Sequence, residues 1–230
     1  MSVVIVDDDP AGLLARRLNE RIGEITATGR NARVALTGGT VATDAYRRLQ
    51  ADDADWDQVE FWWSDERFVP DGHADRNDRQ AREAFLDRLG VPAEHLHPMP
   101  AHGCDQTMAD AADAYAETLP EDGFDVVLLG VGPDGHVASL FPGFAQLDEA
   151  ERRAVEVFGS PKPPPERISL TFGALNDADA VWFVASGEGK ADAVARALAA
   201  DGTVAETPAR GVRGRSETLW FLDPTAASAL

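Results

Sequence analysis

The chain has 230 residues, with 40 acidic side chains against 21 Lys and Arg, and its formal net charge is −19 at pH 7. This length can bury one substantial core, so we expect a single domain over residues 1–230. The acidic surface repels nucleic acid and anionic membranes, which excludes both as favoured partners. The single cysteine excludes an internal disulfide framework. Together with the lack of a signal-peptide pattern, it predicts a cytoplasmic protein.

Short apolar runs alternate with amphipathic stretches along the chain. The runs predict strands at residues 3–6, 33–36, 59–63, 125–129, 154–158, 181–185 and 218–222. The stretches predict helices at residues 10–25, 41–49, 77–89, 106–118 and 190–199, the first with Asp9 as N-cap and Pro10 at its first position. The alternation is typical of an α/β protein with a largely parallel sheet.

Polar and glycine-rich segments directly follow four of the predicted strands. They are residues 37–40, 64–67, 130–136 and 187–190. Because ligands bind at the carboxyl ends of the strands in open α/β sheets, we expect these four segments to form the functional site.

Gly130, Gly132 and Gly135 form a G-x-G-x-x-G pattern, which occurs in dinucleotide-binding folds. An NAD-dependent oxidoreductase is therefore one alternative. A dinucleotide site also needs an acidic residue about 20 positions on, at the end of a second strand. Glu156 lies near that position but inside a poorly formed apolar run, so the match is weak.

The residues between these glycines favour a different interpretation. Pro133 and Asp134 are typical of a tight turn, with Asp134 capping a short helix that begins near His136. A loop at a strand end would expose His136, and histidine titrates near neutral pH. The alternative without a functional role is a glycine turn that only joins the strand to the helix.

Two further strand-end motifs also have two interpretations each. Gly38, Gly39 and Thr40 offer free backbone N–H groups at a helix N-terminus, which suits a phosphate or an oxyanion, or they form a tight connection with Thr40 as N-cap. Residues 65–67, Asp-Glu-Arg, could be a solvated charge cluster. Since they follow the very apolar residues 61–63, we expect them at the rim of the cleft.

His95, His97, His102 and Cys104 are residue types that bind zinc. They lie across a Pro-containing connection, and no paired motif elsewhere supplies further ligands. We therefore expect a structural loop here and no metal site.

Six segments over nearly the whole chain carry a family resemblance. They are residues 36–40; residues 63–70 with Asn77 and Arg79; residues 128–142; residues 160–169; Gly187 with Lys190; and Pro208-Ala209 before residues 219–222. Together they resemble the small, non-propeller 6-phosphogluconolactonases, which are similar in turn to the glucosamine-6-phosphate deaminases. In the deaminases the segment after the histidine continues toward Phe-Asn-Glu-Pro. Here residues 138–142 read Ala-Ser-Leu-Phe-Pro, which favours the lactonase.

The chain departs from the family pattern after Gly39. Many relatives read Ser-Thr-Pro-Lys there, whereas this chain reads Thr40-Val41-Ala42-Thr43. An anion contact made by that lysine is therefore absent or supplied by another residue. The backbone N–H contacts survive the change.

The resemblance implies a single-domain, Rossmann-like three-layer α/β/α fold. It also implies hydrolysis of 6-phospho-D-glucono-1,5-lactone, in the oxidative branch of the pentose phosphate pathway, without cofactor or metal. His136 would be the general base, Asp134 and Gly135 would shape its loop, and Arg167 and Lys190 would bind the phosphate together with Gly38, Gly39 and Thr40. Asp65, Arg67, Asn77 and Arg79 would line the sugar side. The expected partner is a phosphorylated sugar lactone, bound by a monomer or small homo-oligomer. The second alternative is a glucosamine-6-phosphate deaminase or isomerase.

Overall fold

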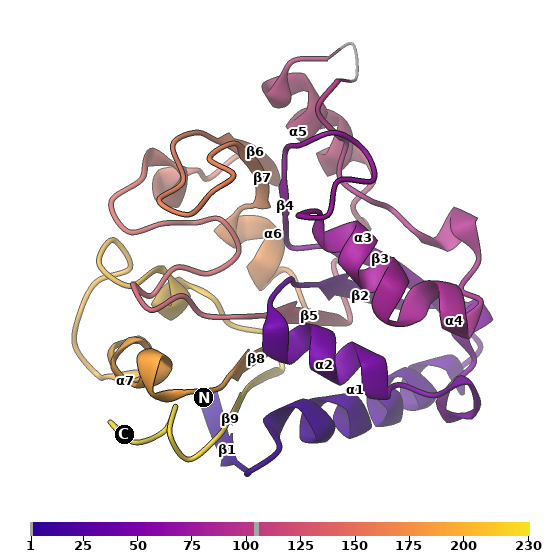
Figure 1. The fold of residues 1–230 in the computed structure, drawn as a ribbon, viewed down its shortest axis with the longest axis horizontal. Coiled ribbons are helices and arrows are strands. Elements are labelled where there is room, and N and C mark those ends of the chain that lie inside the picture. The colour runs from indigo at the N-terminus through magenta and orange to yellow at the C-terminus, as the bar shows by residue number, and fades with distance from the viewer. Residues whose placement is uncertain (1, 104–105) are drawn as a thin grey trace.

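The computed structural model describes residues 2–103 and 106–230. Its central sheet has six parallel strands in the order β1-β9-β8-β5-β2-β3 (Figure 1). These are β1 Ser2–Val6, β2 Ala32–Leu36, β3 Val59–Trp63, β5 Val126–Leu129, β8 Ala180–Ala185 and β9 Glu217–Leu222. The largely parallel sheet predicted from the sequence is confirmed.

Helices cover both faces of this sheet. On one face lie α1 (Pro10–Thr26), α2 (Thr40–Arg48) and the helical segment that begins with α3 (Asn77–Ala81). On the other face lie α5 (Met108–Glu117), α6 (Phe172–Asn176) and α7 (Ala191–Leu198). The three-layer α/β/α architecture is therefore confirmed.

The apolar pattern of the strands follows from this double cover. In β8, Phe183 belongs to the apolar cluster that includes α5 and α7 on one face, while Trp182 belongs to the cluster that includes α1 on the other. A strand that is buried on both sides reads as a continuous apolar run rather than an alternating one. All six residues of β8 are buried accordingly.

The first helix begins as its sequence predicts. The Asp9 side chain accepts a hydrogen bond from the Gly12 N–H at 3.1 Å, and Pro10 occupies the first position of α1. Leu14, Leu18 and Ile22 are fully buried against the sheet. The apolar face thus positions this helix on the sheet, and the N-cap determines where the helix begins. In the described residues, no helix is long and apolar enough to cross a bilayer.

A second, antiparallel sheet lies beside the first in the order β4-β7-β6. Its strands are β4 Asp65–Arg67, β6 Ala154–Val157 and β7 Arg167–Leu170. The sequence predicted the strand at 154–158 but missed β4 and β7, as it missed α6. These strands are three and four residues long and contain charged residues, so they give no apolar run.

The predicted helix at residues 77–89 is interrupted. It consists of α3, a π-helical turn at Arg82–Leu86 and a last short segment, α4 (Asp87–Leu89). Gly90 ends it with φ of 70°, the left-handed conformation that favours glycine at this position.

The strand order reverses direction between β2 and β5. From β2 the chain moves outward to β3, and β5 then lies on the opposite side of β2, followed by β8. Open α/β sheets bind ligands at the carboxyl ends of the strands beside such a reversal. Two of the predicted functional segments, residues 37–40 and 130–136, follow β2 and β5 there.

Candidate active site

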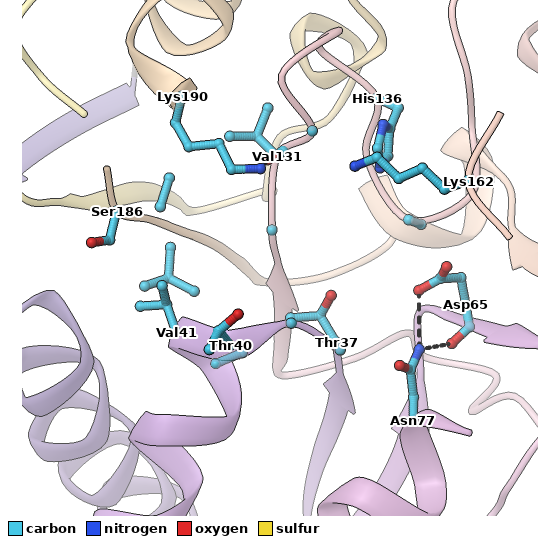
Figure 2. Close-up of a pocket in the computed structure, with 18 of the residues that line it drawn as sticks. Thr37, Thr40, Val41, Asp65, Asn77, Val131, His136, Lys162, Ser186 and Lys190 are labelled. Carbon is cyan, nitrogen blue, oxygen red and sulfur yellow. Dashed lines mark hydrogen bonds between the residues drawn. The ribbon is translucent and has the colours of Figure 1, made fainter. Parts of the chain in front are cut away.

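A cavity of about 340 Å³ lies at the carboxyl ends of β2, β5 and β8 (Figure 2). This volume suits a small ligand. Most of the predicted site residues line it: Gly38, Gly39, Thr40, Asp65, Arg67, Asn77, His136, Arg167 and Lys190. The structure thus brings together residues that are more than 150 positions apart in the chain.

His136 and Asp134 form a closely bonded pair. The distance from His136 Nδ1 to Asp134 Oδ1 is 2.5 Å, and the His136 N–H lies 3.3 Å from the same oxygen. Burial works to raise the pKa of Asp134, but the hydrogen bond and the charge of the His136 ring outweigh it and lower that pKa to about 2. Asp134 is thus a carboxylate that holds Nδ1 and leaves Nε2 as the nitrogen that can take a proton.

The loop that carries this pair is a closed turn rather than the start of a helix. The Gly132 N–H donates to the His136 carbonyl at 2.9 Å, and the Gly135 N–H donates to the Gly132 carbonyl at 2.9 Å. Gly135 and Ala138 have positive φ values of 89° and 50°. The predicted helix near His136 is therefore wrong, because these angles interrupt helical geometry.

The same geometry weighs against a dinucleotide site. Residues 130–144 are all described and contain no helix, whereas a dinucleotide fingerprint needs a helix N-terminus beneath the pyrophosphate. Gly132 has a local reason to be glycine, since a Cβ there would overlap the His136 ring and the Asp134 carboxylate. The pattern thus packs the histidine against its own loop.

The His136 ring packs against a buried aromatic side chain. The His136 ring lies 4.6 Å from the Phe141 ring between centroids, and Phe141 is buried. The Arg167 guanidinium lies 6.0 Å from the same ring. This packing leaves the His136 side chain 13% exposed and facing the cavity.

The start of α2 forms one end of the cavity. Gly39, with φ of 109°, is the N-cap and makes no side-chain capping bond, so the alternative of Thr40 as N-cap is wrong. The first N–H groups of α2 are therefore available to an anion. Thr43, where the chain departs from the family pattern described above, lies outside this lining, in a neighbouring hollow with Arg47 and Arg67.

Lys190 reaches the same end from the turn before α7. Its ammonium donates to the Val131 carbonyl at 2.6 Å, and Figure 2 shows it on the side of Thr40 and Ser186. Burial lowers the pKa of Lys190, the charge of Lys162 lowers it further, and Asp134 opposes both. Since an ammonium has three donors, two remain for a ligand.

Asp65 and Arg167 form a buried pair at the opposite end. Arg167 Nη1 lies 3.7 Å from Asp65 Oδ2, and the Ser139 hydroxyl donates to that oxygen at 2.6 Å. The antiparallel pairing of β4 with β7 places these side chains together. The Arg167 guanidinium also donates to the Lys162 carbonyl at 3.0 Å and the Pro164 carbonyl at 3.2 Å. Arg167 thus fixes a neighbouring loop in addition to lining the cavity.

Glu66 organises the end of the cavity formed by Asp65, Arg67 and Asn77, although it does not line the cavity. Its buried carboxylate accepts hydrogen bonds from the N–H groups of Arg67 (2.8 Å), Asn77 (2.7 Å) and Asp78 (2.9 Å). The Asn77 side chain then donates to the Asp65 carbonyl at 2.8 Å and accepts from Arg67. Gly38 must be glycine, because a Cβ would overlap the Asn77 amide.

Three predicted site residues lie outside the lining. Arg79 bonds to Glu83 at 2.7 Å and to the Gly72 carbonyl at 2.6 Å, with its side chain 44% exposed. Asp134 contacts His136, as described above. Gly135 packs against Thr207.

His97 and His102 have protein neighbours, whereas the buried His95 Nδ1 has no hydrogen-bond partner among the described residues. His97 Nε2 lies 3.1 Å from Glu60 Oε2, and its ring stacks on Trp62 at 4.2 Å, while His102 meets the Phe68 ring edge-on. Cys104 lies outside the described residues. Within residues 2–103 and 106–230, no three His, Cys, Asp or Glu side chains lie close enough to hold a metal ion.

Lys162 lines the cavity although sequence reasoning did not assign it to the site. The signal that could have found it is the rarity of lysine, because Lys162 and Lys190 are the only two in the chain. Both face the same cavity.

A family model for glucosamine-6-phosphate isomerases/6-phosphogluconolactonase matches residues 7–220. The chain belongs to this family. The resemblance drawn from the sequence motifs is thereby confirmed, and the family match spans every residue that lines the cavity.

Individual members of the family resemble the chain closely. It is 45% identical to the 6-phosphogluconolactonase of Streptomyces coelicolor, over 94% of this chain and 88% of that protein. It is 42% identical to the 6-phosphogluconolactonase of Mycobacterium tuberculosis, over 94% of this chain and 92% of that one. The solved structure of the 6-phosphogluconolactonase from Trypanosoma brucei matches with a TM-score of 0.84 at 26% identity, covering 100% and 99% of the two chains.

A deaminase shares the fold as well. A monomeric glucosamine-6-phosphate deaminase matches with a TM-score of 0.84 at 18% identity, over 100% of this chain and 99% of that one. At this identity the likeness concerns the fold alone. The fold therefore does not separate the two activities of the family.

Proposed function

We propose that this protein hydrolyses 6-phospho-D-glucono-1,5-lactone to 6-phospho-D-gluconate, with His136 as general base and without metal or cofactor. The observation that carries the proposal is the His136–Asp134 pair, which faces a cavity whose other end is an anion-binding helix N-terminus. The named relatives at 42–45% identity support the lactonase over the deaminase. The reaction would place the protein in the pentose phosphate pathway of the cytoplasm.

In the proposed reaction, one side chain first accepts a proton and later donates it. His136 Nε2 takes a proton from water as the water oxygen attacks the lactone carbonyl carbon. The tetrahedral intermediate then expels the ring oxygen, which receives that proton from His136. Asp134 holds the imidazole in one orientation and stabilises its transient positive charge. The product acid ionises to the carboxylate.

The test of the proposal is the disappearance of the lactone with purified protein, corrected for spontaneous hydrolysis. Catalysed loss of 6-phosphogluconolactone is expected. Release of ammonia from glucosamine-6-phosphate without lactone hydrolysis would instead assign the protein to the deaminases. Reduction of NAD by the purified protein would assign it to the oxidoreductases.

Activity is expected to survive exhaustive treatment with a metal chelator. The proposed reaction changes no oxidation state, and the proposed base is an imidazole paired with a carboxylate rather than a metal-bound water. The measurement is turnover before and after dialysis against chelator. A loss of turnover that added zinc restores would contradict the prediction.

Replacing Lys190 with methionine is expected to raise KM for the phosphorylated lactone by at least about tenfold, consistent with one lost charge-assisted contact. The phosphate must bind in a protein of net charge −19, so each local cation carries more weight. Methionine keeps the length of the side chain and removes its charge. Steady-state kinetics at constant ionic strength measure the change.

The control substrate is unphosphorylated gluconolactone. It lacks the group that Lys190 is proposed to bind, so Lys190→Met should impair its hydrolysis far less. Arg167→Lys is expected to slow both substrates, because lysine cannot keep the contacts to Ser139, Lys162 and Pro164 at once. If Lys190→Met slows both lactones equally, the phosphate site lies elsewhere.

A further inference from the structure

Lys162 presents a free ammonium group to the cavity. It lies in the loop between β6 and β7 and is exposed at the mouth of the cavity that it lines. Among the residues that the structure describes, none accepts a hydrogen bond or an ion pair from this ammonium.

The main chain of Lys162 is fixed while its side chain is free. Its carbonyl accepts hydrogen bonds from Arg167 Nη2 at 3.0 Å and from the Ser160 hydroxyl at 2.9 Å. Its N–H donates to the Ser160 oxygen at 3.2 Å. Arg167 is itself buried and paired with Asp65. The buried arginine therefore holds the loop in the position that directs Lys162 toward the cavity.

The side chain lies at the His136 end of the cavity. Figure 2 shows Lys162 beside His136 and above Asp65, while Lys190 lies at the other end with Thr40 and Ser186. Burial lowers the pKa of Lys162, and the charges of Arg167 and Arg67 lower it further, whereas the charge of Asp134 raises it. The Asp134 carboxylate that holds His136 thus acts on Lys162 as well.

The other cations at this end are already bonded to protein atoms. Arg67 donates to the Asn77 side chain and to the Asp75 carbonyl, and Arg167 donates to main-chain carbonyls and Ser139. At the other end of the cavity, Lys190 donates to the Val131 carbonyl. Among the cations of this end, Lys162 is the one whose charged group makes no hydrogen bond to a described residue, so it can bind a negative charge that develops in the cavity.

We propose that Lys162 is a catalytic residue whose ammonium donates a hydrogen bond to the lactone carbonyl oxygen and stabilises the oxyanion. The inference rests on the proposed lactonase function. As water adds to the carbonyl carbon, the π electrons of the C=O bond move to its oxygen, and Lys162 binds that charge without transferring its proton. When the carbonyl re-forms and the ring C–O bond breaks, the proton held by His136 goes to the ring oxygen. Stabilising charge that exists only in the intermediate raises kcat rather than affinity.

The test compares the same substitution at the two lysines of the cavity. Lys162→Met is expected to lower kcat for 6-phosphogluconolactone by about 30- to 100-fold, roughly 2.0–2.7 kcal/mol at 1.36 kcal/mol per tenfold, with KM within about threefold of wild type. It should lower kcat/KM for unphosphorylated gluconolactone by a similar factor, because both substrates have the reacting carbonyl. Lys190→Met, the matched control, should act mainly on KM for the phosphorylated substrate.

Two results would overturn the inference. If Lys162→Met raises KM for the phosphorylated lactone selectively, as expected for Lys190→Met, then Lys162 binds phosphate. If kcat and KM both stay within about threefold of wild type, the change is about a tenth of the smallest loss expected for an oxyanion donor. Lys162 then has no role in the chemistry.

A second variant keeps the test decisive if Lys162→Met does not fold. Lys162→Arg retains the charge in a group that does not deprotonate in the accessible pH range. In this variant, the decrease of kcat at alkaline pH should occur at a higher pH than in wild type. The measurement uses saturating substrate and is corrected for spontaneous hydrolysis. An unchanged alkaline fall would also overturn the inference.

Failure of the inference and failure of the proposed function give different results. If the wild-type protein hydrolyses neither lactone, the proposed function fails before any variant is compared. If the wild type is active, His136→Ala is inactive and Lys162→Met is normal, the function stands and only the role of Lys162 falls.

Discussion

His136→Ala is expected to lower kcat for 6-phosphogluconolactone by about two to four orders of magnitude, the usual contribution of a positioned general base. The side chain is 13% exposed, faces the cavity and is paired with Asp134 at 2.5 Å. KM should change little, because the proposed phosphate contacts lie at the other end of the cavity. Steady-state kinetics with a correction for spontaneous hydrolysis measure both constants.

A second substitution separates chemistry from folding. His136→Asn keeps a polar side chain that can accept a hydrogen bond from its surroundings but cannot act as a base near neutral pH. It should be as inactive as His136→Ala, while circular dichroism and thermal unfolding confirm a folded protein in both cases. Turnover close to wild type in either folded variant would remove His136 from the mechanism.

The parts of the site that follow parallel strands could be predicted from the sequence. Gly38, Gly39 and Thr40 follow β2, His136 follows β5, and Lys190 follows β8, and all five line one cavity. Apolar runs identify the strands, and the carboxyl ends of neighbouring parallel strands must meet at one edge. The convergence of these residues is thus a consequence of topology.

The Asp65–Arg167 pair depends on a contact that no local pattern reveals. It forms because β4 and β7 are antiparallel neighbours, although about 100 residues separate them in the chain. Strands of three and four residues with charged side chains give no periodic signal. Lys162 was missed for a related reason, since its loop is placed by the guanidinium of Arg167.

The position of Arg79 on its helix explains why its side chain does not line the cavity. α3 begins at Asn77, whose side chain faces Asp65 and the cavity. Two residues further along an α-helix the side chain points roughly 200° away. Arg79 therefore turns outward to Glu83 and does not line the cavity.

Asp134→Asn is expected to lower kcat by about 10²- to 10³-fold with little change in KM, because an amide can donate to His136 Nδ1 and favour the wrong tautomer. In the wild type, Asp134 Oδ1 lies 2.5 Å from that nitrogen, and the carboxylate lies outside the lining of the cavity. The substitution preserves shape, removes the charge and replaces one acceptor oxygen with an NH2 donor. Its effect should therefore fall on the proton transfer and spare substrate binding.

The control for Asp134→Asn is the same change at Asp148, an exposed carboxylate in a separate hollow, which should retain wild-type kinetics. The pH profile supplies a second check. The pKa of Asp134 is lowered to about 2, so Asp134 stays ionised above pH 4, and a loss of kcat/KM on acidification above that pH does not come from Asp134. A wrong tautomer lowers kcat by orders of magnitude. If kcat of Asp134→Asn stays within about threefold of wild type, His136 keeps its productive tautomer without Asp134. The pair would then be a structural contact, and the general base would act without a partner.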